Sequence, residues 1–518
     1  MTVFRSPLPD IAIPDLSITE LLMRDLGTRP DEVVLVDGPS GREMTAGALM
    51  AGIKALAGGL SARGFGPGQT VALLSPNIPE FCLVYHAVAW AGGTVTTINP
   101  TYTAPEVRHQ LQDSGASLLI TVPPFADVAT EAAEGTGIRE VAVIGAAPGL
   151  TPLADLMGPP QEAQAPVDLD RHILVLPYSS GTTGLPKGVM LTHRNLVANV
   201  CQIQAVRPVE QGEWTVGFLP FFHIYGMTVL VNLYLGNGGR IVTMPRFDLE
   251  LFLKLIQDYR TPQAYVVPPV VLAMAKHPLV DQYDLSALQY AFSGAAPLGA
   301  DLAEALHARL GVRCEQGYGM TEMSPASHVS PKGKGKPGAA GITVPNTECR
   351  IVDPDSGQDR GPGEEGELWV RGPLIMTGYL NNADATRQTL TEDGWMRTGD
   401  LAMFDDEGYC TITDRLKELI KYKGFQVAPA EVEAALVTSP DITDAAVIGV
   451  ADDEAGEVPM AFVVPAPGAD VTLASVQAHL EGRLAHFKQV RRLQVVEAIP
   501  KSASGKILRR MLRDQVAD

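Results

Sequence analysis

Residues 178–189 read YSSGTTGLPKGV and stand between an apolar run, ILVLP at 173–177, and a helix-like segment, THRNLVANV at 192–200. A strand, a loop of small residues and a helix in this order turn backbone N–H groups and hydroxyls toward one concavity, which phosphate oxygens need. It is not the P-loop of the NTPases, because Pro186 stands five positions after Gly181, where that pattern has glycine. If only GTTG were present, an ordinary turn between strand and helix would explain it. The full stretch predicts a phosphate-binding loop.

Upstream of this loop the sequence alternates short β-branched runs with helical patterns. TVALLS at 70–75 and TVTTIN at 94–99 predict strands, and a helix is expected between them over 80–91. A second helix is expected to begin after Thr103, because Thr103 and Glu106 form a capping-box pattern. SLLITV at 117–122 predicts the next strand. This βαβαβ order favours a parallel sheet, and we expect one large α/β body over most of the first four hundred residues.

Downstream, the polar and lysine-rich run DRLKELIKYKG at 414–424 indicates a domain hinge. Beyond it a helix is expected to begin at Pro429, and the runs AAVIGV, MAFVVP and RLQVVEAIP predict strands. We expect one helical face to carry Val476, Leu480, Leu484 and Phe487. The fold class is therefore α/β, with a large multi-subdomain αβ N-terminal body (residues 1–414) and a small α+β C-terminal domain (415–518) of about one hundred residues. PKGKGKPGAAG, from Pro331, is expected to form a mobile surface loop.

Composition excludes several classes of protein. The 518 residues carry 40 Lys and Arg against 59 Asp and Glu, a net charge of −19, which disfavours nucleic acid and anionic membranes as partners. The 5 cysteines are scattered, which argues against a disulfide framework or a zinc site and favours a cytoplasmic location. No apolar run has a clean membrane-spanning length, so no membrane insertion is expected.

The phosphate-loop stretch resembles the signature of the acyl-adenylate-forming enzymes, which include acyl-CoA synthetases, adenylation domains and luciferases. QGYGMTE (316–322), GELWVRG (366–372), WMRTGD (395–400) and PKSASGKILRR (500–510) resemble the later motifs in order and spacing. LPFFHIYG (219–226) and KELIKYKGFQVAP (417–429) are most similar to 4-coumarate–CoA ligases and bacterial cinnamate-activating relatives. The resemblance covers nearly the whole chain and implies ATP-dependent formation of an acyl-adenylate, followed by transfer of the acyl group to a thiol.

The resemblance implies a nucleotide site on several motifs. Tyr318 is expected to stack on adenine, Asp400 to accept hydrogen bonds from the ribose hydroxyls, and Arg415 to supply donors. The full set implied for ATP and AMP is Ser179, Ser180, Gly181, Thr182, Thr183, Gly184, Lys187, Gly294, Ala295, Ala296, Gln316, Gly317, Tyr318, Gly319, Thr321, Asp400, Arg415, Lys421 and Gln426.

The catalytic groups that the resemblance implies are Lys506, His223 and Thr321, with Glu322 as the ligand of Mg²⁺. A lysine near the end of a chain is by default a flexible surface charge, but Lys506 in SASGK matches the position whose ammonium neutralises the attack of a carboxylate on the α-phosphate. A lone histidine among aromatics is more often a core residue, and His223 is expected to orient the acid and the path of the thiol.

The second step implies coenzyme A and a moving domain. The C-terminal domain is expected to be a mobile lid that swings about a hinge near Lys417 and presents Lys423 and Gly424 to the thiol. The alternative for Lys423 is that it has no role with the thiol and belongs to a solvated basic face. The stretches that match the acyl pocket contain Ile224, Tyr225, Val229, Gly319, Pro325 and Ala326.

The expected co-substrates are a small carboxylic acid, ATP with Mg²⁺, and CoA, and a carrier-protein thiol stays open as the acceptor. A 4-coumarate or cinnamate type of acid is preferred over a medium- or long-chain fatty acid. A luciferase-like oxygenase and an inactive nucleotide-binding partner protein also stay open as functions. The protein is expected to be a monomer or a homodimer.

Overall fold

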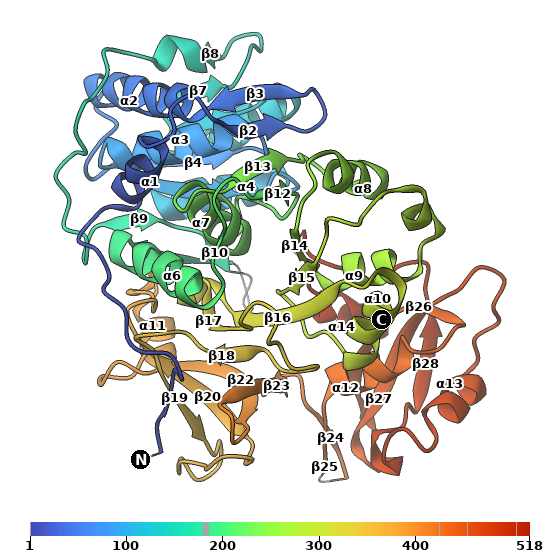
Figure 1. Cartoon of the computed structure of the whole chain (residues 1–518). Coiled ribbons are helices and arrows are strands. Elements are labelled where there is room, and N and C mark those ends of the chain that lie inside the picture. Colours follow the sequence, from blue (N-terminus) through green and yellow to red (C-terminus); the bar gives the residue numbers. More distant parts are fainter. Residues whose placement is uncertain (1, 180–185, 424, 453, 504, 518) are drawn as a thin grey trace.

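A computed structural model gives the fold, and it describes residues 2–179, 186–423, 425–452, 454–503 and 505–517. A large body built on three sheets occupies most of the chain, and a smaller domain, orange to red in Figure 1, lies against its lower right side. The α/β fold class is confirmed: the body is a large multi-sheet αβ unit, and the C-terminal domain is small and mixed. No helix in the described part of the chain is both long and apolar enough to cross a membrane.

The first sheet of the body contains the predicted βαβαβ unit. Its order is β10-β11-β9-β5-β4-β6-β7-β8, and β4 pairs in parallel with both β5 and β6. The predicted helix start is confirmed, because Glu106 Oε2 accepts a hydrogen bond of 2.7 Å from the Thr103 N–H. The elements are β4 (Thr70–Leu74), α3 (Pro79–Trp90), β5 (Thr94–Ile98), α4 (Ala104–Ser114), β6 (Ala116–Thr121), α5 (Ala126–Ala133), β7 (Glu140–Val143), β8 (Thr151–Pro152), β9 (Ile173–Val175), β10 (Tyr178–Ser179), β11 (Lys187–Thr192) and α6 (His193–Val206).

The second sheet carries the nucleotide motifs on strands that lie side by side. Its order is β1-β19-β20-β22-β23-β18-β17-β16-β15-β14, and only β14, β15 and β16 pair in parallel within the described residues. The elements are β1 (Phe4–Arg5), β14 (Gln263–Val266), α9 (Pro268–Lys276), β15 (Tyr290–Ser293), α10 (Ala300–Leu310), β16 (Arg313–Gly319), β17 (Ala326–Val329), β18 (Gly341–Thr343), β19 (Glu348–Val352), β20 (Gly366–Arg371), β22 (Met396–Phe404) and β23 (Tyr409–Arg415).

A four-stranded sheet, β12-β13-β2-β3, completes the body, which has one large apolar core and a smaller apolar cluster beneath α4 and α5. A short strand, β21 (Gly378–Tyr379), pairs with β11 and is followed by α11 (Ala383–Thr389). The remaining elements are α1 (Ile18–Leu26), β2 (Val33–Asp37), β3 (Arg42–Thr45), α2 (Ala46–Ala62), β12 (Trp214–Gly217), η3 (Gly226–Asn232), α7 (Leu233–Leu235), β13 (Arg240–Thr243), α8 (Leu249–Asp258) and η5 (Thr321–Met323).

The C-terminal domain has its own sheet and its own apolar clusters. Residues 416–419 connect β23 of the body to β24 of the small sheet, which agrees in place with the predicted hinge; its motion and the 414/415 boundary stay predictions. The helix predicted at Pro429 is confirmed. The elements are β24 (Ile420–Tyr422), β25 (Phe425–Val427), α12 (Pro429–Leu436), β26 (Ile442–Asp452), β27 (Gly456–Pro465), α13 (Leu473–Leu480), β28 (Arg492–Val495) and α14 (Arg509–Ala517).

Two local expectations were wrong. Leu484 and Phe487 do not continue the helical face of Val476 and Leu480, because α13 ends at Leu480, where Glu481 takes an extended conformation. They still pack against the same apolar cluster from the following turns. The segment from Pro331 is tied down rather than loose: the Lys336 ammonium lies 2.6 Å from Asp405 Oδ2, and Gly335 N–H donates to Glu315 Oε1. Ion pairs order a segment that has little apolar surface.

Candidate active site

The flanks of the phosphate loop form an antiparallel hairpin. Ser179 on β10 is the register partner of Lys187 on β11, and the Tyr178 hydroxyl donates to Asp113 Oδ2 at 2.7 Å, which fixes β10 to the end of α4. The hairpin places Lys187 at the exit of the loop. The predicted loop residues Ser180, Gly181, Thr182, Thr183 and Gly184 lie outside the described residues.

Small residues at the end of β15 leave room beside the body's second sheet. A Cβ atom on Gly294 would lie 3.1 Å from the Tyr225 ring, so a side chain at this position would crowd that ring. Ala295 follows with a positive φ of 69°, and it is exposed. The amide of Gln316 exchanges hydrogen bonds of 3.0 and 3.1 Å with the backbone of Leu298. Gln316 therefore holds the segment with Ala295, Ala296 and Pro297 in place from β16.

A tyrosine, an aspartate and an arginine converge from three strands. Asp400 on β22 is the register partner of Arg415 on β23, and Arg415 Nε lies 3.3 Å from Asp400 Oδ1. The Tyr318 hydroxyl donates to Asp400 Oδ2 at 2.6 Å from β16, on which Gly317 and Gly319 flank it. Burial raises the pKa of Asp400, and the Arg415 charge opposes the shift. Each carboxylate oxygen keeps a second acceptor position for a ligand hydroxyl.

Glu322 is a buried carboxylate with one free oxygen. It is 3% exposed, and its Oε1 accepts a hydrogen bond of 2.8 Å from the Tyr379 hydroxyl. In the described part of the chain its Oε2 is buried without a hydrogen-bond partner. A buried carboxylate oxygen is costly unless something pairs with it, and a hard cation is the partner that such an oxygen suits. The residue present therefore fits the Mg²⁺ that the family implies.

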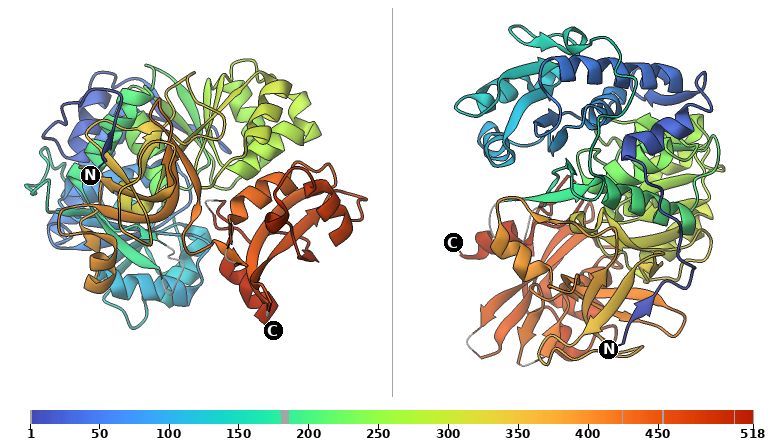
Figure 2. Two further views of the ribbon diagram at one scale, coloured as in Figure 1. Left: turned by 90° about the horizontal axis from the view of Figure 1, so that it is seen from below. Right: turned by 90° about the vertical axis from the view of Figure 1, so that its left-hand side faces the viewer.

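Lys506 reaches the body from the C-terminal domain. Its turn is closed by Ser502 N–H donating to the Lys506 carbonyl at 2.8 Å, and Gly505, with a φ of 81°, lies against Val267 of the body. Gly299 of the body likewise meets Ala434 on α12. Figure 2 shows the red domain beside the green segment that carries α9 and α10. The two domains therefore touch at the Lys506 turn and at α12.

Burial lowers the pKa of Lys506 to about 8, and the Arg415 guanidinium acts in the same direction. The carboxylates of Glu418, Asp400 and Glu322 oppose the shift. Lys506 is therefore still an ammonium at neutral pH, in a site that brings two predicted anionic residues of the body near it. This is the arrangement that a charge-neutralising lysine needs.

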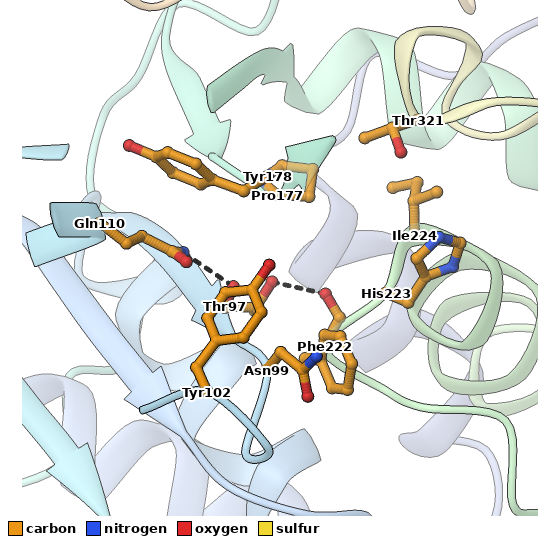
Figure 3. Close-up of a pocket in the computed structure, with 10 residues that line it drawn as sticks. All are labelled: Thr97, Asn99, Tyr102, Gln110, Pro177, Tyr178, Phe222, His223, Ile224 and Thr321. Carbon is orange, nitrogen blue, oxygen red and sulfur yellow. Dashed lines mark hydrogen bonds between the residues drawn. The ribbon is translucent and has the colours of Figure 1, made fainter. Parts of the chain in front are cut away.

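His223 lines a pocket together with Ile224 and Thr321. Figure 3 shows His223 and Ile224 on one side of the pocket with Thr321 above them, and Tyr102 on the other side. The pocket is lined by Thr97, Asn99, Tyr102, Gln110, Pro177, Tyr178, Phe222, His223, Ile224 and Thr321. Burial, and then the charge of Lys506, lowers the pKa of His223 to about 4. The imidazole is therefore neutral at neutral pH, and it has little tendency to take up a proton.

The predicted acyl residues come together but are largely covered. Ile224, Tyr225 and Val229 are 1%, 8% and 3% exposed. The Tyr225 hydroxyl donates to the Phe292 carbonyl at 3.2 Å, which fixes the orientation of its ring. Pro325 accepts a hydrogen bond from the Met320 N–H, and Ala326 is bonded to Asn199, which places both next to Gly319.

The β24–β25 hairpin is exposed along most of its length. Lys421 and Gln426 are exposed, Lys423 is surface-paired, and Figure 1 draws the hairpin at the lower edge of the molecule. The resemblance implies that Lys421 and Gln426 bind the nucleotide, and that role stays a prediction. Lys417 is exposed in the connecting turn, and Gly424 lies outside the described residues.

Two residues that sequence reasoning missed complete the arrangement. Tyr379 binds Glu322, and nothing in TGYLNN marks it as different from a core tyrosine. Asp414 Oδ2 accepts a hydrogen bond of 3.1 Å from the Ala430 N–H in the first turn of α12. Burial raises the pKa of Asp414 to about 6, against the N–H groups of Arg415 and Ala430. Asp414 caps α12 from the preceding strand, so no pattern within the helix sequence marks it.

Comparison with known proteins agrees with this geometry. The profile of the AMP-binding enzymes matches residues 22–380, and that of the AMP-binding enzyme C-terminal domain matches residues 431–506. The chain is 41% identical to 4-coumarate–CoA ligase 5 of Oryza sativa subsp. japonica, over 99% of this chain and 97% of that protein.

Two solved structures are similar over almost the whole chain. A crystal structure of an anthranilate CoA ligase in complex with anthranoyl-AMP has a TM-score of 0.91 at 26% identity and covers 98% of each chain. ATP-bound MatB from Rhodopseudomonas palustris has a TM-score of 0.88 at 29% identity, over 97% of this chain and 99% of that one. The likeness therefore extends over both domains.

Proposed function

The chain belongs to the AMP-binding enzyme family as an adenylate-forming acyl-CoA ligase, and we propose that its acid is an aryl acid of the 4-coumarate or cinnamate type. The observation that supports adenylation is the buried Lys506, whose charge interacts with those of Asp400 and Glu322 and lowers the pKa of His223. ATP and the acid would first give acyl-adenylate and pyrophosphate, and CoA would then give acyl-CoA and AMP.

In the first step a carboxylate oxygen of the acid attacks the α-phosphorus, and the bond from that phosphorus to pyrophosphate breaks. Two anions must approach each other, and the Lys506 ammonium would neutralise the developing repulsion. Tyr318 would stack on adenine, and Asp400 and Arg415 would hold the ribose. Glu322 would hold Mg²⁺, which neutralises charge on the phosphates.

In the second step the thiol attacks the acyl carbon, and AMP leaves. His223, with a pKa of about 4, is a neutral imidazole at neutral pH. We therefore assign it to orienting the acid and bordering the path of the thiol rather than to general base catalysis. Lys423 and Gly424 would approach CoA once the C-terminal domain has turned about Lys417.

The preference for an aryl acid rests on the relatives and on the pocket. The rice relative is a 4-coumarate–CoA ligase, and the structural neighbour at TM-score 0.91 is an anthranilate CoA ligase. Ile224 and Val229 are apolar and branched, and the ring of Tyr225 lies over Gly294. A planar apolar ring suits such side chains, although an apolar pocket discriminates between acids by only about 1–3 kcal/mol for each methylene.

The test is AMP formation from ATP and Mg²⁺ with 4-coumarate, cinnamate, benzoate, octanoate and palmitate, each with and without CoA. The proposal expects the highest kcat/KM with the two cinnamates and turnover that requires CoA. Turnover confined to octanoate or palmitate would replace the aryl acid with a fatty acid. A failure to release AMP with any of these acids would leave an inactive nucleotide-binding protein as the better description.

A further inference from the structure

Tyr379 lies between the phosphate strand and Glu322, although neither motif includes it. It is the register partner of Val189, and the Leu380 N–H donates to the Gly188 carbonyl at 2.8 Å. On its other side the Tyr379 N–H donates to Thr386 Oγ1 at 2.9 Å, in α11. The backbone of Tyr379 is therefore fixed from both sides, and the residue is 7% exposed.

Two opposite charges meet this one ring. The Tyr379 hydroxyl donates to Glu322 Oε1 at 2.8 Å, and the Lys187 ammonium lies 4.5 Å from the centre of the ring. The carboxylate thus contacts the hydroxyl edge, and the ammonium contacts the face. Lys187 and Glu322, both of which the structure describes, meet the ring from different directions and form no ion pair with each other.

The separation of these charges has a chemical use. A lysine and a glutamate close together in a partly buried place would pair directly, because neither finds enough water there. In such a pair the Glu322 carboxylate would no longer be free to bind a cation, and the Lys187 ammonium would no longer be free to bind a phosphate. The ring satisfies each charge partly, by a hydrogen bond and by a cation–π contact, and Glu322 Oε2 stays unpaired in the described part of the chain.

We propose that Tyr379 is a positioning residue for adenylation: it keeps the Glu322 carboxylate and the Lys187 ammonium apart, so that the first holds Mg²⁺ and the second holds the phosphates of ATP. The inference rests on the proposed roles of Glu322 and Lys187 and adds the residue that coordinates them. Tyr379 itself touches neither the acid nor the reacting phosphorus in this scheme.

Two substitutions separate the two contacts. Tyr379→Phe removes the hydroxyl and keeps the ring. The Mg²⁺ concentration needed for half of the metal-dependent gain in ATP affinity should therefore rise about tenfold. The affinity for ATP without metal should stay unchanged. Tyr379→Leu removes both contacts, so it should also weaken metal-free ATP binding by about threefold to thirtyfold. Tyr409 offers a matched control, because Lys336 lies 4.5 Å from the centre of its ring on a surface away from Glu322.

The experiment is calorimetric titration of the full-length wild type, Tyr379→Phe, Tyr379→Leu and Tyr409→Leu with ATP, at a series of Mg²⁺ concentrations and with chelator. Thioester formation from supplied acyl-adenylate is measured in parallel, and we expect all four proteins to perform it equally. A Tyr379→Phe protein with wild-type dependence on Mg²⁺ would overturn the inference, as would equal effects of Tyr379→Leu and Tyr409→Leu. If the affinity of the wild-type protein for ATP does not depend on Mg²⁺, the proposed role of Glu322 is overturned instead.

Discussion

The C-terminal domain presents lysines in two places, and only one of them meets the body. The turn with Lys506 lies against Val267 of the body, and burial lowers the pKa of Lys506 to about 8. The β24–β25 hairpin, with Lys421 and Lys423, lies at the surface. The two segments belong to one domain, and we expect a turn of that domain to change which of them lies at the site. In this scheme the arrangement with Lys506 at the body serves adenylation, and Lys423 acts in the step that follows.

The largest expected effect comes from the buried lysine. Lys506→Ala should lower acid-dependent pyrophosphate release about a hundredfold to a thousandfold, because the charge on the approaching anions is no longer neutralised. Thioester formation from supplied acyl-adenylate should stay as in the wild type. Lys501→Ala, in the same turn and paired with Asp444 at 2.6 Å, is the control. An equal loss in both half-reactions would break the comparison.

The next effect depends on pH. Because the ammonium is the active form and the pKa of Lys506 is about 8, the rate of adenylation should be highest well below pH 8, fall to half near that pKa, and then fall about tenfold for each further pH unit. Single-turnover adenylation from about pH 6.5 to about pH 9.5 measures this on both sides of that pKa. Lys506→Arg, whose guanidinium does not lose its proton in this range, should be slower and have no such decline. A decline that persists in Lys506→Arg would assign it to another group.

The smallest effect is expected from the exposed hairpin. Lys423 lies 3.3 Å from Glu454 on the surface, and exposed charges of this kind contribute little. Lys423→Ala should therefore slow thioester formation about twofold to fivefold and leave adenylation unchanged. Rapid-quench measurement of each half-reaction decides this. A loss in adenylation would show that the hairpin acts in both steps and would remove the distinction drawn above.

The sequence predicted the features that are local. The alternation from Thr70 and the capping pattern at Thr103 predicted the first sheet, because periodicity and caps depend on near neighbours. The motifs placed Asp400 and Arg415 in one site, where they pair across adjacent strands. What the sequence could not predict are contacts between distant segments: Tyr379 lies 57 residues from Glu322, and only the pairing of β21 with β11 brings it there. The orientation of the C-terminal domain relative to the body likewise cannot be predicted from a motif.

The cap on α12 has a consequence for exchanging domains between relatives. Ala428, which precedes the helix, has no side-chain oxygen, and the Ala430 N–H is satisfied by Asp414 instead. Asp414 is the last residue of the predicted N-terminal body, so a chimaera spliced after residue 414 would leave the helix cap to the donor of the body. A missing cap costs about 0.5–2 kcal/mol, enough to fray a short helix. A C-terminal domain that is to be transplanted from this protein should therefore include Asp414, which lies on β23, the last strand of the N-terminal body.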